Sequence, residues 1–138
     1  MAIIDMQTMR YINLLDKASN VKTKRCFFYG GVIFFAVPSE LVSRAIGPQA
    51  SNIRKIEEKL GRRIRIIKEP NGIKDMDEFL KEVVLPTRFK SIEIIDNEVL
   101  MIAGSNQNKA NLFGRNKKRY EELKRVVEDI FNLNLRIV

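Results

Sequence analysis

Two short glycine loops stand at equivalent places in the sequence and have residue types that can hold an anion. The first begins at Gly47 and the second at Gly114, and in both an apolar residue precedes the glycine and an amphipathic pattern follows the loop. The start of a helix offers unpaired backbone N–H groups and a partial positive charge, which together favour a negatively charged ligand. Because glycine lets the backbone turn sharply and approach a ligand closely, the two loops are predicted to bind phosphate groups.

Basic residues gather beside both loops. The chain has 25 Lys and Arg residues against 17 Asp and Glu, a formal net charge of +8. The positive residues concentrate over residues 54–68, just after the first loop, and over residues 115–125, in and after the second. The glutamates at 57–58 and 121–122 are interpreted as solvated partners of neighbouring Lys and Arg on exposed helix faces. Positive charge placed beside both loops favours nucleic acid as the partner.

The residues for common catalytic chemistry are missing. The sequence has no histidine and one cysteine, Cys26, so it has neither a Ser-His pair nor the ligands of a structural zinc site. It has no GxxxxGK[ST] stretch for nucleotide binding. It also has no apolar run near the ~18 residues of a membrane span and no signal-peptide pattern. We therefore expect a cytoplasmic protein that is not an enzyme, with no metal, cofactor, small-molecule substrate or membrane partner.

Both loops occupy the same position in a repeated order of elements. Residues 26–67 and 91–138 each show the pattern of two strands, a short helix, the loop, a long helix and a final strand. In the first copy, Gly30-Gly31 predicts a tight hairpin turn between the strands, and Ser39 is predicted to cap the short helix. Internal repetition defines the folding unit, so the chain is predicted to be an α+β protein built from two copies of one unit.

A further helix opens each copy, and a short linker separates the copies. Apolar residues at helical spacing predict these helices over residues 5–18 and 76–84. Residues 69–74 contain proline followed by an Asn-Gly pair, which is typical of a connection rather than of an element. The sequence therefore predicts two units, residues 1–70 and 71–138.

This order of elements resembles the KH domain in its type II arrangement. The stretch from Ala45 to Ile53 is similar to the GXXG loop of that family and the start of its long helix. The second loop, Gly114-Arg115-Asn116, repeats the resemblance, and two such units in tandem resemble the archaeal NusA family of transcription factors. The resemblance implies two tandem type II KH domains, each a three-stranded mixed sheet with helices packed on one face.

The resemblance also implies a non-catalytic protein that binds single-stranded RNA and acts in transcription elongation, termination or antitermination. Loop residues would clamp the RNA backbone, and bases would lie in an apolar groove between the helices and the edge strand. The RNA-binding residues carried over are Gly47, Pro48, Gln49, Ala50, Ser51, Asn52, Arg54, Lys55, Gly114, Arg115, Asn116, Lys117, Lys118 and Arg119. The base-groove residues carried over are Ile46, Ile53, Ile66, Phe113 and Ile137, and the alternative for each of them is a place in the core.

Both loops depart from the GXXG pattern at its last position, which is Ala50 in the first loop and Lys117 in the second. If that position needs a positive φ, a side chain there has an energetic cost. Pro48 also has no N–H to offer a phosphate, whereas the second loop is rich in Arg and Lys. We therefore predict that the second unit binds RNA more strongly. The alternative function is a protein-interaction module that docks on RNA polymerase or a ribosomal particle.

Overall fold

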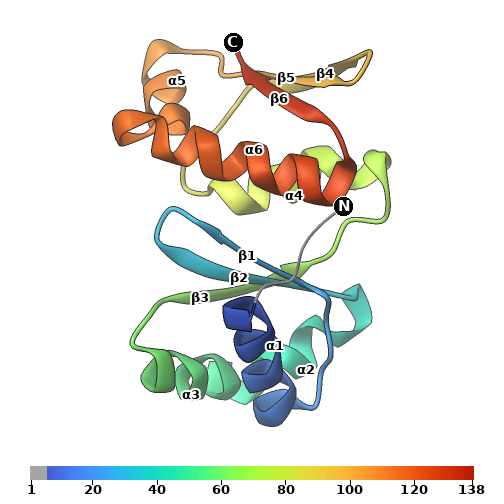
Figure 1. Cartoon of the computed structure of the whole chain (residues 1–138), viewed down its shortest axis with the longest axis vertical. Coiled ribbons are helices and arrows are strands. Elements are labelled where there is room, and N and C mark those ends of the chain that lie inside the picture. Colours follow the sequence, from blue (N-terminus) through green and yellow to red (C-terminus); the bar gives the residue numbers. More distant parts are fainter. Residues whose placement is uncertain (1–5) are drawn as a thin grey trace. The chain divides into compact units, whose positions relative to one another are not determined.

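The computed structural model describes residues 6–138, and over this range the chain is α+β, with two three-stranded mixed sheets and six α-helices (Figure 1). The described residues divide into two compact units, residues 6–69 and 70–138. The first residue of the predicted helix 5–18, and the first five residues of the predicted unit 1–70, lie outside the described residues. No helix in the described range is long and apolar enough to cross a membrane.

The two units repeat one order of elements. The first consists of α1 (Met6–Ser19), β1 (Arg25–Tyr29), β2 (Val32–Val37), α2 (Val42–Ile46), α3 (Ser51–Leu60) and β3 (Ile64–Lys68). The second consists of α4 (Met76–Val84), β4 (Ser91–Ile95), β5 (Glu98–Ile102), α5 (Asn106–Phe113), α6 (Lys118–Phe131) and β6 (Asn134–Ile137). The predicted repeat is therefore confirmed at the level of secondary structure.

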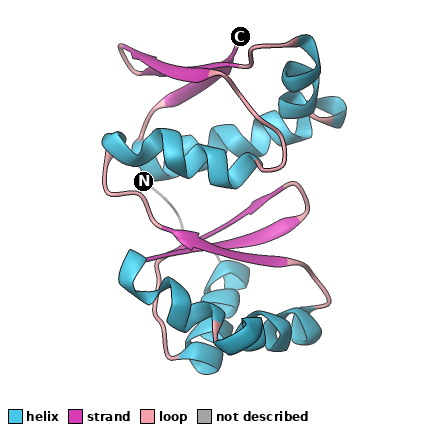
Figure 2. Ribbon diagram, turned by 180° about the vertical axis from the view of Figure 1, so that it is seen from behind, coloured by secondary structure: helices cyan, strands magenta, loops and turns pink. Residues whose placement is uncertain are grey.

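Each sheet has the same topology. The first strand pairs antiparallel with the second, and the second pairs parallel with the third, so β3 and β6 lie at sheet edges. The helices of each unit gather on one face of its sheet (Figure 2). A parallel pair needs a crossover connection, and the helix pairs α2–α3 and α5–α6 supply it. The glycine loops lie inside these crossovers, between the two helices.

The core of the first unit is built from alternate residues of β2. Ile33, Phe35 and Val37 are completely buried and pack with Leu15 of α1 and Ile56 of α3. Successive side chains of a strand point to opposite faces, so these three residues share the face that the helices cover. The strand–helix packing fixes α3, and with it the loop that leads into α3.

The core of the second unit joins α4 and α6 to the sheet. The rings of Phe79 and Phe131 meet edge to face, with their centroids 5.9 Å apart. Buried side chains come from both helices, from α5, and from strands β5 and β6: Met76, Leu80, Val83, Val84, Val99, Met101, Leu112, Leu123, Val126, Val127, Leu135 and Ile137. The predicted apolar stripe of residues 76–84 thus lies in the core, as the helical spacing indicated.

The start of the crossover in the first unit differs from the prediction. Ser39 does not cap α2; it is the first residue of a single 3₁₀ turn, Ser39–Leu41, whose own cap position is held by Pro38. Leu41 stands at the cap position of α2 and has no side-chain acceptor. The prediction was wrong because the turn places Ser39 three residues before the α-helix begins.

Candidate nucleic-acid interface

The glycines that open the two loops have nearly the same backbone conformation. Gly47 has φ 80° and ψ 165°, and Gly114 has φ 71° and ψ 179°. This region is almost restricted to glycine. A Cβ at Gly47 would lie 2.8 Å from the side chains of Ser51 and Asn52, and one at Gly114 would lie 2.8 Å from Cγ of Arg119. Both glycines are therefore required by the geometry of the loops.

The last two positions of each loop are left-handed. Gln49 and Ala50 have φ values of 55° and 59°, and Asn116 and Lys117 have 56° and 60°. The fourth position thus has a positive φ in both loops, which is the condition under which a side chain there has an energetic cost. The left-handed third position was not predicted from the sequence. Asparagine accepts this conformation more readily than glutamine, so the second loop is the less strained at its third position.

Backbone hydrogen bonds repeat between the two loops. Each loop glycine donates its N–H to the carbonyl four residues before it, at 3.0 Å for both Gly47 and Gly114. The fourth residue donates back to the glycine carbonyl, at 3.1 Å for Ala50 and 3.2 Å for Lys117. Two loops of different sequence thus share one fold, and each leads directly into the N-terminus of a long helix.

The left-handed fourth position predicts a stabilising substitution. A left-handed residue with a side chain costs about 1–2 kcal/mol, so Ala50→Gly is expected to raise the free energy of unfolding by about 0.5–1 kcal/mol after the entropy of glycine is subtracted. Urea unfolding followed by circular dichroism measures the change. Ala110→Gly, in the exposed right-handed helix α5, is the matched control and is expected to destabilise by about 1 kcal/mol. If Ala50→Gly and Ala110→Gly changed the free energy of unfolding in the same direction, the assignment of strain to Ala50 would be contradicted.

Charge is distributed unequally between the two loops. In the first loop Pro48 and Gln49 are exposed but carry no charge, and the exposed cations Arg54 and Lys55 follow only in α3. In the second, exposed cations stand within the loop and at the start of α6: Arg115, Lys117, Lys118 and Arg119. A phosphate at the second loop would therefore meet both the helix dipole and side-chain charge.

One residue that the resemblance to the KH domain assigns to RNA binding also makes a hydrogen bond within the protein. The Asn52 side chain donates a hydrogen bond from Nδ2 to the Arg44 carbonyl oxygen, at 3.1 Å. This bond ties the first turn of α3 back to α2 across the loop. Gly47, Ala50 and Ser51 are partly buried beside it. The first loop is thus held by its own side chains as well as by its backbone.

The residues carried over as the base groove divide into two groups. Ile46, Ile53 and Phe113 are half-buried, so each keeps some exposed surface. Ile66 and Ile137 are only 8% and 4% exposed and belong with the buried core residues. Contact between any of the five and a base stays a prediction, and the first three have the surface for it.

The sequence reasoning missed an aromatic and cationic stack in the second unit. The rings of Phe113 and Tyr120 meet at 60° with centroids 5.0 Å apart, and Lys124 Nζ lies 5.3 Å from the centroid of the Tyr120 ring. The Tyr120 hydroxyl donates to the Leu135 carbonyl oxygen of β6, at 2.9 Å. The spacing of apolar residues does not show what the Tyr120 hydroxyl bonds, so this contact could not be predicted.

Glu57 corrects an interpretation made from the sequence. It was interpreted as a solvated partner of nearby cations, but its Oε2 accepts a hydrogen bond from the Ile64 N–H of β3, at 3.0 Å. Glu57 is half-buried, whereas the adjacent Glu58 is exposed. The carboxylate thus lies between α3 and the edge strand. Among the described residues, no group of three or more His, Cys, Asp or Glu side chains is placed to hold a metal ion.

Comparison with known proteins identifies a KH domain in the chain. Residues 32–81 match the family model of the KH domain, and the match includes the first loop and α3. A KH domain indicates RNA binding. The second loop lies outside the matched residues. A search of curated proteins finds no match.

The fold also occurs among solved structures, of which 21 chains match. One of them, described as "Crystal structure of APE1850", has a TM-score of 0.67 and 21% sequence identity. The alignment covers 98% of this chain and 100% of that chain. At this identity the likeness shows the fold alone.

Proposed function

We propose that the protein is a non-catalytic transcription factor of the NusA type, which binds single-stranded RNA during elongation, termination or antitermination. The observation that carries the proposal is the pair of loops: Gly47 and Gly114 open two loops of one backbone conformation, each at the N-terminus of a long helix. The KH match over residues 32–81 supports RNA as the ligand. The resemblance of the tandem arrangement to NusA supports the role in transcription.

The binding follows from the geometry of the loops. The helix dipoles of α3 and α6 add partial positive charge at the end of each loop. RNA phosphates bind at these two points, and Lys and Arg side chains contribute charge-assisted hydrogen bonds. Arg115 and Lys117 lie within the second loop, so the second unit binds the RNA backbone more tightly than the first. The bases then lie against the half-buried Ile53 and Phe113.

The salt dependence of RNA binding tests this function. If the four cations of the second loop each contact a phosphate, the logarithm of the binding constant falls with the logarithm of salt at a slope of about −3. Raising salt fourfold is then expected to weaken binding about 50-fold. Fluorescence anisotropy with a labelled single-stranded RNA of about 12 nucleotides measures both quantities. The duplex of the same sequence is the control, because its bases are not available to the apolar surface.

Two outcomes of this titration would contradict the proposal. One is the absence of binding to any single-stranded RNA at low salt. The other is equal binding of the duplex and the single strand, which would indicate a general polycation rather than a KH-type clamp. Either result would move the conclusion to the second candidate function.

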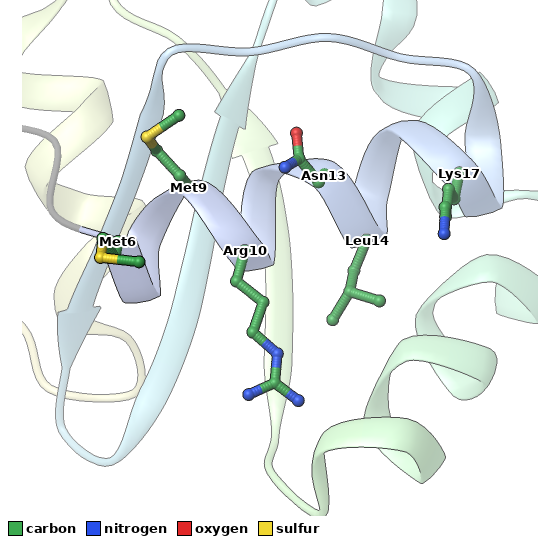
Figure 3. A pocket seen from close by; sticks show the side chains of 6 residues that line it. All are labelled: Met6, Met9, Arg10, Asn13, Leu14 and Lys17. Atoms are coloured by element: carbon green, nitrogen blue, oxygen red, sulfur yellow. The ribbon is translucent and has the colours of Figure 1, made fainter.

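The second candidate is docking on an acidic protein surface such as RNA polymerase, and a pocket on α1 favours it. The pocket has a volume of about 350 Å³ and is lined by Met6, Met9, Arg10, Asn13, Leu14 and Lys17 (Figure 3). Met6 is 87% exposed and Met9 is 52% exposed. Flexible methionines beside two cations suit an acidic, partly apolar partner. Binding to purified RNA polymerase that Met9→Glu abolishes, and that changes in the glycine loops leave intact, would favour this candidate.

A further inference from the structure

The outer edge of β3 presents backbone groups beside α3. The Arg63 carbonyl accepts from β2 and the Glu69 N–H donates to β2. Backbone groups alternate between the two sides of a strand. Ile64 and Ile66 therefore turn their N–H and C=O groups away from β2, to the edge of the sheet. We call the surface strip between this edge and α3 the first seam.

The outer edge of β6 has the same arrangement beside α6. Asn134 donates its N–H to the carbonyl of Asn97, directly before β5, and Val138 donates to the Met101 carbonyl of β5, both at 2.9 Å. By the same alternation, Leu135 and Ile137 turn their backbone groups to the sheet edge. We call the strip between this edge and α6 the second seam. Pairing in the two sheets makes Ile64 and Leu135 equivalent, since they lie opposite Ile33 and Val99 respectively.

Different side chains reach these equivalent edge positions. In the first seam the Glu57 carboxylate accepts from the Ile64 N–H at 3.0 Å. In the second the Tyr120 hydroxyl donates to the Leu135 carbonyl at 2.9 Å. Glu57 and Lys124 both stand ten positions after their loop glycine. The first seam therefore has an anion at the position where the second has a cation above an aromatic ring.

These side chains have opposite chemistry toward RNA. A carboxylate repels phosphate but accepts hydrogen bonds from the exocyclic amino groups of cytosine, adenine and guanine. Uracil has no amino group, and its one N–H lies between two carbonyl oxygens that a carboxylate repels. Phe113, Tyr120 and Lys124 instead offer ring faces and a positive charge. Stacking on an aromatic ring tolerates any base, and Lys124 attracts phosphate.

We propose that the two units divide the recognition of RNA: Glu57 in the first unit selects bases that carry an amino group, and Tyr120 with Lys124 in the second unit binds any nucleotide. Base preference then comes mainly from the first unit and affinity from the second. The proposal rests on the proposed RNA-binding function and assigns specificity to a side chain outside the glycine loops. Wild-type protein is accordingly expected to bind oligocytidine about tenfold more tightly than oligouridine.

Glu57→Gln tests the first half of the proposal. The glutamine oxygen can keep the bond from the Ile64 N–H, while its NH₂ group replaces the other carboxylate oxygen and turns an acceptor into a donor. The preference for oligocytidine over oligouridine is expected to disappear or reverse, a change of about tenfold in the ratio of dissociation constants. Glu58→Gln is the matched control: it removes the same charge from the adjacent, exposed residue and is expected to leave the ratio unchanged.

Lys124→Met tests the second half, because it removes the positive charge from the second seam without adding a carboxylate that could select bases. It is expected to weaken binding of both oligonucleotides by the same factor, about tenfold, and to flatten the salt slope by about 0.7. Arg125→Met makes the same charge change at the adjacent exposed residue. It is expected to weaken binding by no more than about threefold, since an exposed charge beyond the seam is screened.

The outcomes separate this inference from the proposed function. If wild-type protein binds neither oligonucleotide, the proposed function fails. If it binds both and Glu57→Gln leaves their ratio unchanged, RNA binding stands and the division between the units is overturned. An equal change of the ratio by Glu58→Gln, or a base-dependent effect of Lys124→Met, would overturn it as well. Circular dichroism of each variant confirms that the fold is retained in the samples compared.

Discussion

Changing Arg115 and Lys117 to aspartate is expected to weaken the binding of single-stranded RNA about 100-fold. Both side chains are exposed within the second loop, at the N-terminus of α6, where the helix dipole adds partial positive charge. A hydrogen bond between charged groups contributes about 1.5 kcal/mol, so the loss of two is about 3 kcal/mol. That free energy corresponds to roughly a factor of 100 in the dissociation constant. Fluorescence anisotropy at low salt measures it, because screening reduces the effect at high salt.

The matched change in the first loop is Pro48→Asp with Gln49→Asp. It is expected to weaken the binding of single-stranded RNA by less than about tenfold. These residues are exposed and uncharged, so the change adds repulsion without removing an ionic contact. A charge-matched comparison uses Arg115→Gln with Lys117→Gln, which lowers the net charge by the same amount as the pair in the first loop. An equal or greater loss from the first loop would contradict the ranking of the two units.

Gly114→Ala is expected to destabilise the second unit by about 3 kcal/mol and to abolish RNA binding by its loop. At φ 71° and ψ 179° the backbone strain of a non-glycine residue is about 1–3 kcal/mol. The new Cβ would in addition lie 2.9 Å from Cβ of Arg119, close to the helix backbone, where little can move. Thermal unfolding measures the change as a fall in Tm of about 12 °C or more.

Gly72→Ala separates the strain from the steric clash. Gly72 has nearly the same backbone conformation, φ 82° and ψ −171°, but a Cβ there would meet nothing within 4 Å. It is expected to lower Tm by no more than half as much as Gly114→Ala, and to leave RNA affinity unchanged. If Gly114→Ala were as mild as Gly72→Ala, the loop would not need the close approach of Gly114 to Arg119.

Features that depend on neighbours in the chain could be predicted from the sequence. The hairpin turn at Gly30 and Gly31 forms with both residues at positive φ, because a tight turn between twisted strands requires it. The repeated order of elements and the α+β fold followed from the spacing of apolar residues. The expectation that Ala50 would be strained followed from the one position at which the loop departs from the GXXG pattern.

Features that depend on contacts between distant residues could not be predicted. Glu57 has the same sequence context as Glu58, and only the register of β3 against α3 brings the Ile64 N–H within reach of its carboxylate. The bond from Tyr120 to Leu135 joins residues 15 positions apart. The cap at Ser39 was predicted wrongly because residue type favours a cap there, while the actual start of α2 is set by a preceding 3₁₀ turn.

The side chains that bond the edges of β3 and β6 also bear on self-association. An uncovered strand edge is a template to which another chain can add a strand, and proteins commonly guard such edges with charge. Glu57 occupies the Ile64 N–H of one edge, and Tyr120 occupies the Leu135 carbonyl of the other. Each therefore removes one of the hydrogen bonds that an intruding strand would need. The residues that we assign to RNA recognition thus also help to keep concentrated protein from joining edge to edge.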